Sequence, residues 1–157
     1  MGFTANFRLS SYFFPVTVDG DAYLEMLWTH VRPGLVAKRK LSATTFMQDG
    51  APPHIKAEVK QFLLRTFTED HLISQGFRQF WPPYSPDLNC LDYFFWGYVR
   101  DLVYAEGIFS NVNELKNKII EAYATVTQDQ MQKAVYHLLD RCRLVVEEGG
   151  GHIEHLM

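Results

Sequence analysis

Two acidic residues are candidates for a catalytic or ligand-binding site, because each lies where a regular element meets a loop. Asp49 follows the β-prone run Thr44–Gln48, and Asp92 lies in the first turn of an aromatic-rich helix that follows a proline-rich loop. Open α/β sheets bind ligands outside the carboxyl ends of their strands, where loops and helix starts converge. Residues 50–91 leave room for a helix, a strand and a loop, which would bring the chain back to the same end of the sheet. We therefore predict that Asp49 and Asp92 face one site.

Two carboxylates at one site need a partner for their charge. At about 4 Å they repel by roughly 4 kcal/mol at an effective dielectric constant of 20, so the pair requires a shared proton or a cation. Magnesium and manganese take oxygen ligands and stabilise the attacking and leaving oxygens of a phosphoryl displacement. The pair Asp49 and Asp92 therefore predicts a Mg²⁺ or Mn²⁺ site suited to nuclease or strand-transfer chemistry.

Each of these acids also has a purely structural explanation. Asp49 precedes glycine in a pair that is common at tight turns, and Asp92 could simply complement a helix dipole. Asp87 competes with Asp92 as a ligand but fits a loop or capping role better. Asp19 and Asp21 are explained by a turn and a helix cap, so neither is expected to bind metal.

The elements that must position Asp49 and Asp92 indicate an α/β fold over residues 1–107. Pro15 weakens one of the expected strands, because proline cannot donate to a sheet ladder. Apolar spacing predicts a helix that is interrupted or ended near Pro33 and Gly34, followed by two further helices. The expected strands lie near 3–9, 12–18, 44–48 and 77–81, and the expected helices near 24–35, 55–67 and 91–103.

Two further helices are predicted over residues 111–148, with a tail over 149–157. Asn111 with Glu114, and Thr127 with Gln130, have the spacing of capping boxes, and three glycines end the second helix. Aromatic residues at helical spacing belong to a core far more often than to a base-stacking surface. We therefore assign Phe94, Phe95 and Tyr98 to the core.

The composition argues against a disordered, a disulfide-rich or a membrane-spanning protein. The 157 residues suit one domain, and a hydrophobic content of 47% excludes a wholly disordered chain. The net charge of −3 argues against tight autonomous binding to DNA. Two cysteines are too few for a disulfide framework and lack zinc-site spacing, and no apolar run is long enough to cross a bilayer. We expect a soluble protein in a reducing, intracellular setting.

Several sequence motifs resemble the catalytic domain of mariner-like transposases of the DDE/D superfamily. The resemblance spans nearly the whole chain. The segments that carry it are Phe46–His54, Trp81–Asp92 and Trp96–Tyr98, together with Gly2–Phe7, Tyr23–Leu27 and Gly150–His155.

The resemblance implies an RNase H-like fold in which three acidic residues bind divalent metal, either Mg²⁺ or Mn²⁺. Asp49 matches the second acid of that family and Asp92 the third. Such enzymes cut and join DNA at transposon ends, which implies DNA as the partner and the nucleus as the location. His54, Lys56, Tyr84 and Arg100 are the candidate contacts to DNA.

The match to the family is incomplete. The family's first acid lies on a central strand upstream of the segment that resembles Gly2–Phe7, and its DNA-recognition modules lie further upstream. The expectation is an N-terminally truncated domain, with weak metal binding and impaired cleavage. The alternative is an inactive transposon remnant that acts as a nucleic-acid-binding or protein-interaction module. Loss of the central strand would expose edges beside 3–9 and 44–48, which predicts low solubility or a homodimer.

Overall fold

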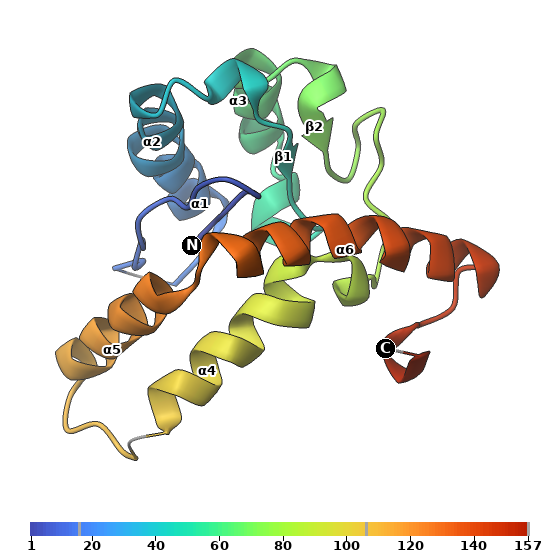
Figure 1. Cartoon of the computed structure of the whole chain (residues 1–157). Coiled ribbons are helices and arrows are strands. Elements are labelled where there is room, and N and C mark those ends of the chain that lie inside the picture. Colours follow the sequence, from blue (N-terminus) through green and yellow to red (C-terminus); the bar gives the residue numbers. More distant parts are fainter. Residues whose placement is uncertain (16, 106, 157) are drawn as a thin grey trace. The chain divides into compact units, whose positions relative to one another are not determined.

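The computed structural model describes residues 1–15, 17–105 and 107–156 and divides the chain into two compact units (Figure 1). We call Tyr12–Tyr84 the strand unit, and Met1–Ser11 with Ser85–Met157 the helical unit. The described residues are mostly helical, and they contain one pair of parallel strands. The predicted mixture of helices and strands is therefore confirmed, with less sheet than expected.

The strand unit contains a strand–helix–strand sequence, as predicted. Strand β1 spans Phe46–Met47, helix α3 spans Ala57–Thr66, and strand β2 spans Leu72–Ile73. The two strands are parallel, with Phe46 opposite Leu72 and Met47 opposite Ile73. Two strands that run the same way need a crossover connection, and α3 supplies it.

The second strand lies earlier than the run Phe77–Trp81 that was predicted to form it. In that run only Gln79 makes a β-bridge, and its partner is Ile73. The run is not extended because the chain turns tightly at its start, where the Phe77 N–H donates to the Ser74 carbonyl at 3.3 Å. Phe77 and Trp81 are nevertheless buried. Their apolar character therefore reflects burial in a loop, and the strand prediction at 77–81 is wrong.

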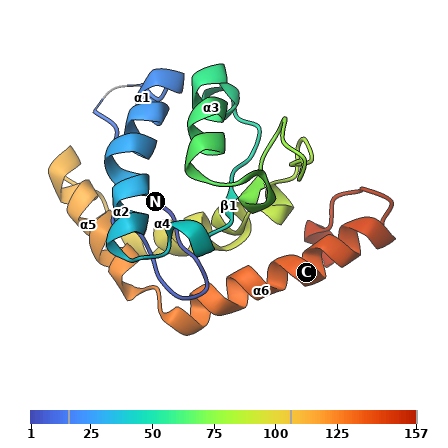
Figure 2. The same ribbon diagram turned by 90° about the horizontal axis from the view of Figure 1, so that it is seen from above.

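The first helix of the strand unit runs through the proline that was expected to disturb it. Helix α1 spans Gly20–Met26, a wider π-helical turn spans Leu27–Val31, and α2 continues over Arg32–Ala37. The Arg32 N–H donates to the Leu27 carbonyl five residues back. Because proline offers no N–H, a widened turn just before Pro33 lets the helix continue. The break or end predicted near Pro33 and Gly34 is therefore absent, and the irregularity is the widened turn that precedes them at Leu27–Val31. Helices α1 and α3 lie side by side (Figure 2).

The two predicted N-terminal strands do not form. Around residues 3–9 a single bridge joins Phe3 to Arg8, because Thr4 closes a tight turn in which its hydroxyl oxygen accepts from the backbone N–H groups of Asn6 and Phe7. Residues 12–15, 17 and 18 contain no strand, and Val16 lies outside the described residues. Residues 3–9 therefore offer no strand edge of the kind expected to pair two copies of the chain, and the predicted homodimer is not supported.

In the helical unit, three helices enclose an aromatic core. A π-helical turn over Leu91–Phe95 leads into α4 at Trp96–Tyr104, which packs against α5 at Val112–Thr125. Phe95 is fully buried, with Phe94 and Tyr98 partly buried beside it, which confirms their assignment to the core. The other buried members of this core are Val99, Val103, Ala122, Tyr123, Val126 and Met131.

The helix ends follow the predicted caps. Thr127 and Gln130 form a full capping box at the start of α6, which spans Gln128–Glu147. At α5 the Asn111 side chain accepts from the Glu114 N–H at 2.9 Å, while the Glu114 carboxylate accepts from Ser110 N–H instead of Asn111. Positive φ angles at Gly149 and Gly150 end α6. Short 3-10 turns complete the described elements, at Leu41–Ala43, Pro52–Ile55, Glu69–His71, Pro86–Leu88 and Glu154–Leu156.

Candidate functional site

Asp49 lies immediately beyond the end of a strand, as predicted. The N–H of Gln48 still pairs with β2, donating to the carbonyl of Ile73 at 3.0 Å, and the chain then leaves the sheet. The 3-10 turn at Pro52–Ile55 follows and brings His54 back towards Asp49. The local sequence thus places a carboxylate and an imidazole at the carboxyl end of β1.

One oxygen of the Asp49 carboxylate is already engaged. Oδ1 accepts from the Ala51 N–H at 3.0 Å and lies 2.6 Å from Nδ1 of His54. The hydrogen bond from His54 holds the pKa of Asp49 below its usual range, against the opposing effect of partial burial. Among the described residues Oδ2 has no hydrogen-bond partner, and the Asp49 side chain is 38% exposed. The carboxylate is therefore oriented, ionised and open on one oxygen.

A buried polar network supports the His54 ring and backbone. The ring packs against Tyr23, with centroids 4.3 Å apart, and the Tyr23 hydroxyl donates to Oε1 of Gln48 at 2.8 Å. Nε2 of Gln48 donates to the His54 carbonyl and to Oγ of Ser74, both at 3.0 Å. Burial raises the pKa of the Tyr23 hydroxyl, so this group stays a hydrogen-bond donor. We call Tyr23, Gln48, Asp49, His54 and Ser74 the Asp49 network.

Sequence reasoning missed three members of this network. Tyr23 and Gln48 lie within segments that carry the family resemblance, but no spacing rule links them to each other or to Ser74. The side chain of Gln48 is 6% exposed and that of Ser74 is fully buried. A polar residue directly after a short apolar strand, such as Gln48 or Ser74, is the signal that identifies such a position, because buried polar groups need partners.

Asp92 belongs to the helical unit, in the first turn of the helix that leads into α4. It is exposed, and its backbone N–H donates to the Asn89 carbonyl at 2.8 Å. The Asn89 side chain accepts from the Leu91 N–H at 3.1 Å and so fixes the start of the helix. The predicted place of Asp92 in the chain is confirmed. That it shares an ion with Asp49, which lies in the strand unit, stays a prediction.

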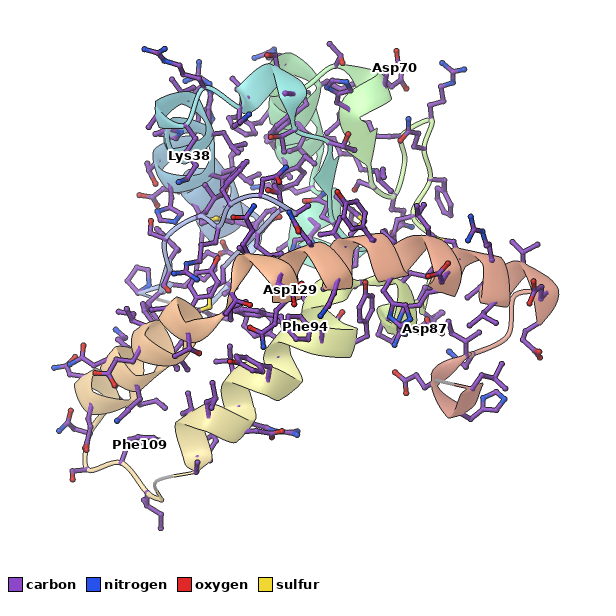
Figure 3. The ribbon with its side chains drawn as sticks, in the orientation of Figure 1. Lys38, Asp70, Asp87, Phe94, Phe109 and Asp129 are labelled. Carbon is purple, nitrogen blue, oxygen red and sulfur yellow. The ribbon has the colours of Figure 1, made fainter. Side chains whose placement is uncertain are left out.

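Asp87 holds the C-terminal tail of the helical unit. Its side chain is buried, and Oδ2 accepts from the Ile153 N–H at 3.2 Å, while its backbone carbonyl accepts from Nη1 of Arg141 at 2.9 Å. The Arg141 guanidinium lies 3.9 Å from the ring centroid of Tyr93. Figure 3 shows Asp87 in the short 3-10 turn at Pro86–Leu88, below α6. A loop and capping role was predicted for Asp87, and the structure adds that its partner is the tail.

The four residues proposed to contact DNA lie in different settings. Nζ of Lys56 lies 2.5 Å from Asp21 and 3.9 Å from Glu58, and the hydrogen bond with Asp21 raises the pKa of Lys56. Arg100, on α4, is paired with Asp101 at 3.2 Å. Tyr84 is 91% exposed with a φ of +54°, and His54 contacts Asp49. His54, Lys56 and Tyr84 belong to the strand unit and Arg100 to the helical unit.

Asp49 and Asp92 offer the hard oxygen donors that Mg²⁺ and Mn²⁺ prefer. Across residues 1–15, 17–105 and 107–156, no three His, Cys, Asp or Glu side chains gather closely enough to hold a metal ion. Over the same residues no helix has the length and apolar character needed to cross a membrane.

Comparison with known proteins points to a transposon. The chain is 26% identical over 111 residues to the transposable element Tc3 transposase of Caenorhabditis elegans, a match that covers 70% of this chain. The chain spans 31% of the length of that curated relative. It matches no protein-family model. The similarity supports a transposase-related origin.

Proposed function

We propose that this chain is part of an RNase H-like catalytic domain of a mariner-like DDE/D transposase, in which Asp49 and Asp92 are metal ligands. The similarity to the Tc3 transposase supports the lineage. The observation that carries the site is the Asp49 carboxylate, which lies at the end of a strand with one oxygen bound and the other open.

The residues present fit a divalent ion. Oδ2 of Asp49 and the exposed carboxylate of Asp92 are hard oxygen donors, whereas the nearby nitrogen of His54 is turned to Asp49. A bound Mg²⁺ or Mn²⁺ would activate water and stabilise charge on a phosphate. His54 and the Ala51 N–H keep Asp49 ionised and oriented. The carboxylate would therefore need little rearrangement to bind a metal ion.

The reaction that this site supports is metal-dependent hydrolysis and transesterification of DNA phosphodiesters, in the nucleus. Two carboxylates leave most of the coordination shell of the ion to water. We therefore expect weak ion binding and slow cleavage from Asp49 and Asp92 alone.

The second candidate function is a catalytically inactive module that binds nucleic acid or protein. Exposed cations without carboxylate partners favour it, among them Arg39 and Lys40 within the described residues, because they attract polyanions without any metal.

A cleavage assay separates these two functions. The full chain is incubated with labelled duplex DNA and Mn²⁺, beside Asp49→Ala, Asp92→Ala and the exposed control Asp129→Ala. Slow nicking that is lost in the first two variants and kept in the control supports the transposase site. Binding without any nicking supports the inactive module, and nicking that all the variants retain would show that Asp49 and Asp92 do not carry the cleavage.

A further inference from the structure

The polar turn that follows strand β2 lies beside the loop that begins at Asp49. Strands β1 and β2 run side by side and parallel (Figure 1), so their carboxyl ends share one edge of the sheet. Asp49 leaves that edge after β1, and Ser74 and Gln75 leave it after β2. Contact between the two chain segments continues past the strands, because Nε2 of Gln48 donates to Oγ of Ser74 at 3.0 Å.

A tight turn fixes the backbone position of Gln75. The Phe77 N–H donates to the Ser74 carbonyl at 3.3 Å, which closes a turn over four residues. Gly76, the third of them, has a φ of +86°, a conformation that favours glycine at this position of a turn. Gln75 is the second residue of the turn, and the chain on both sides of it is therefore held in place.

The side-chain amide of Gln75 packs directly against Gly50, the residue after Asp49. Oε1 of Gln75 fills the space that a Cβ on Gly50 would need, and Cδ lies 3.3 Å from that position. Gly50 does not have a positive φ, so its backbone alone does not call for glycine. The missing side chain at position 50 is what lets the amide oxygen approach the Asp49 loop.

This amide has no hydrogen-bond partner in the part of the chain that the structure describes, although Gln75 is only partly exposed. Oδ2 of Asp49 is open in the same way. Polar groups that are partly buried usually have a partner in the protein or in solvent. An ionised carboxylate oxygen and a neutral amide oxygen at one sheet edge thus both remain available to a ligand.

We propose that Oε1 of Gln75 is a further ligand of the metal ion at Asp49. The inference rests on the metal site of the proposed function and adds a donor to it. Carbonyl oxygens suit Mg²⁺ and Mn²⁺, and a neutral amide adds none of the repulsion that a second carboxylate brings. Gln75 and Asp49 both belong to the strand unit, so this pair of donors does not depend on where Asp92 lies.

A nearby cation limits how tightly this site binds. Nζ of Lys60 lies 2.7 Å from the position that a Cβ on Gly76 would take, next to Gln75 in the chain. A positive charge there repels a divalent ion. Lys60→Gln should therefore tighten metal binding, and weaker binding in this variant would argue against an ion beside Gln75.

Titration of Mn²⁺ into the full chain, followed by electron paramagnetic resonance, tests the assignment. Gln75→Ala should weaken binding roughly ten-fold, the scale of loss when a residue that supports a metal site is removed. The matched control is the exposed amide of Gln61 on α3, and Gln61→Ala should leave the affinity unchanged. An unchanged affinity in Gln75→Ala, or an equal loss in both variants, would overturn the assignment.

Gly50 provides a second variant that acts through the same amide. Gly50→Ala should displace the amide and weaken Mn²⁺ binding about as much as Gln75→Ala does. In the double variant the Cβ at position 75 lies 3.7 Å from the new Cβ at position 50, which is an ordinary contact. The double variant should therefore bind no more weakly than either single variant, because both changes remove one interaction. Additive losses would contradict the proposal.

A metal-free measurement tests the juxtaposition itself. Gln75→Glu in EDTA should raise the pKa of Asp49, because two carboxylates at one site disfavour the charged form of each other. A carbon-13 NMR titration of Asp49 measures the change, and Gln61→Glu should leave the Asp49 titration in place. An unmoved pKa in Gln75→Glu would show that position 75 does not face the carboxylate.

The Mn²⁺ titration also separates this inference from the proposed function. Binding that is lost in Asp49→Asn but unchanged in Gln75→Ala would reject the inference and leave the metal role of Asp49 in place. Binding that needs Asp49 and Gln75 but survives Asp92→Asn would support the inference and reject the pairing of Asp49 with Asp92. The absence of any saturable binding to the wild-type chain would reject both.

Discussion

Nδ1 of His54 lies 2.6 Å from Oδ1 of Asp49, across five residues that leave a strand and turn back. This contact is short because the 3-10 turn over Pro52–Ile55 fixes the His54 backbone, whose carbonyl also accepts from Nε2 of Gln48. The carboxylate is thus held by the fold before any ligand arrives. Such preorganisation is what a metal-binding carboxylate requires.

Replacing His54 by alanine should raise the pKa of Asp49 in the metal-free protein. The hydrogen bond from His54 is the largest cause of the lowered pKa of Asp49, and partial burial alone acts in the opposite direction. A carbon-13 NMR titration of the Asp49 carboxyl in EDTA measures the shift. The exposed control His155→Ala should leave the Asp49 titration where it is, and an unmoved Asp49 pKa in His54→Ala would show that the contact has no electrostatic effect.

The same contact fixes the sign of a pH effect on stability. Because the pKa of Asp49 is lower in the folded than in the unfolded chain, its ionised form stabilises the fold above the ordinary carboxyl pKa. That contribution is lost as the pH falls through the folded value. Urea titrations at a series of acidic pH values should show a shallower decline of the free energy of unfolding in Asp49→Asn than in the wild type. Parallel declines would contradict this.

Removing the Asp87 side chain should destabilise the helical unit. Asp87→Ala leaves the buried N–H of Ile153 without its acceptor, which costs about 1 to 3 kcal/mol for an unsatisfied buried donor. The exposed acid Asp140 is the matched control, since its loss removes only a surface ion pair with Arg143. The free energy of unfolding in urea measures both, and equal costs would mean that the tail is not held by Asp87.

Phe95→Ala should be the most damaging single substitution in the core of the helical unit. The ring is fully buried and packs against Phe3 and Tyr123, with centroids 5.8 and 5.2 Å away. Truncating such a ring costs about 3 to 5 kcal/mol. The neighbouring Trp96 is 43% exposed, so Trp96→Ala should cost clearly less in the same unfolding experiment. A larger cost for Trp96 would argue against this packing.

The two cysteines should react at very different rates. Cys90 is buried and its pKa is raised to about 11 by that burial, whereas Cys142 is exposed. A disulfide reagent at about pH 8 should therefore label Cys142 quickly and Cys90 only after denaturant is added, because the thiolate is the reactive form. Cys142→Ser should abolish the fast phase. A fast phase that survives this change would place Cys90 at the surface.

The elements that were predicted correctly are those whose signals are local. The Thr127–Gln130 capping box and the aromatic spacing around Phe95 are set within a few residues, and both are present. The strand that leads to Asp49 was also recognised, because a β-prone run ends at a turn.

The strand predictions at 3–9 and 77–81 were wrong because side-chain hydrogen bonds and burial in a loop determine the local structure there. Thr4 turns the chain at a run that was predicted to be extended, and Phe77 and Trp81 are buried in a loop and not in a strand. The contacts of Tyr23 with Gln48, and of Asp87 with Ile153, join residues far apart in sequence. No periodicity encodes such pairs, because the tertiary fold brings them together.

Titration of Mn²⁺ followed by electron paramagnetic resonance measures whether Asp49 and Asp92 bind a metal ion. We predict weak, saturable binding to the full chain that is lost in both Asp49→Asn and Asp92→Asn and retained in Asp129→Asn. Binding that survives either of the first two changes, or that all three variants share, would contradict the assignment of these two aspartates as ligands of one ion.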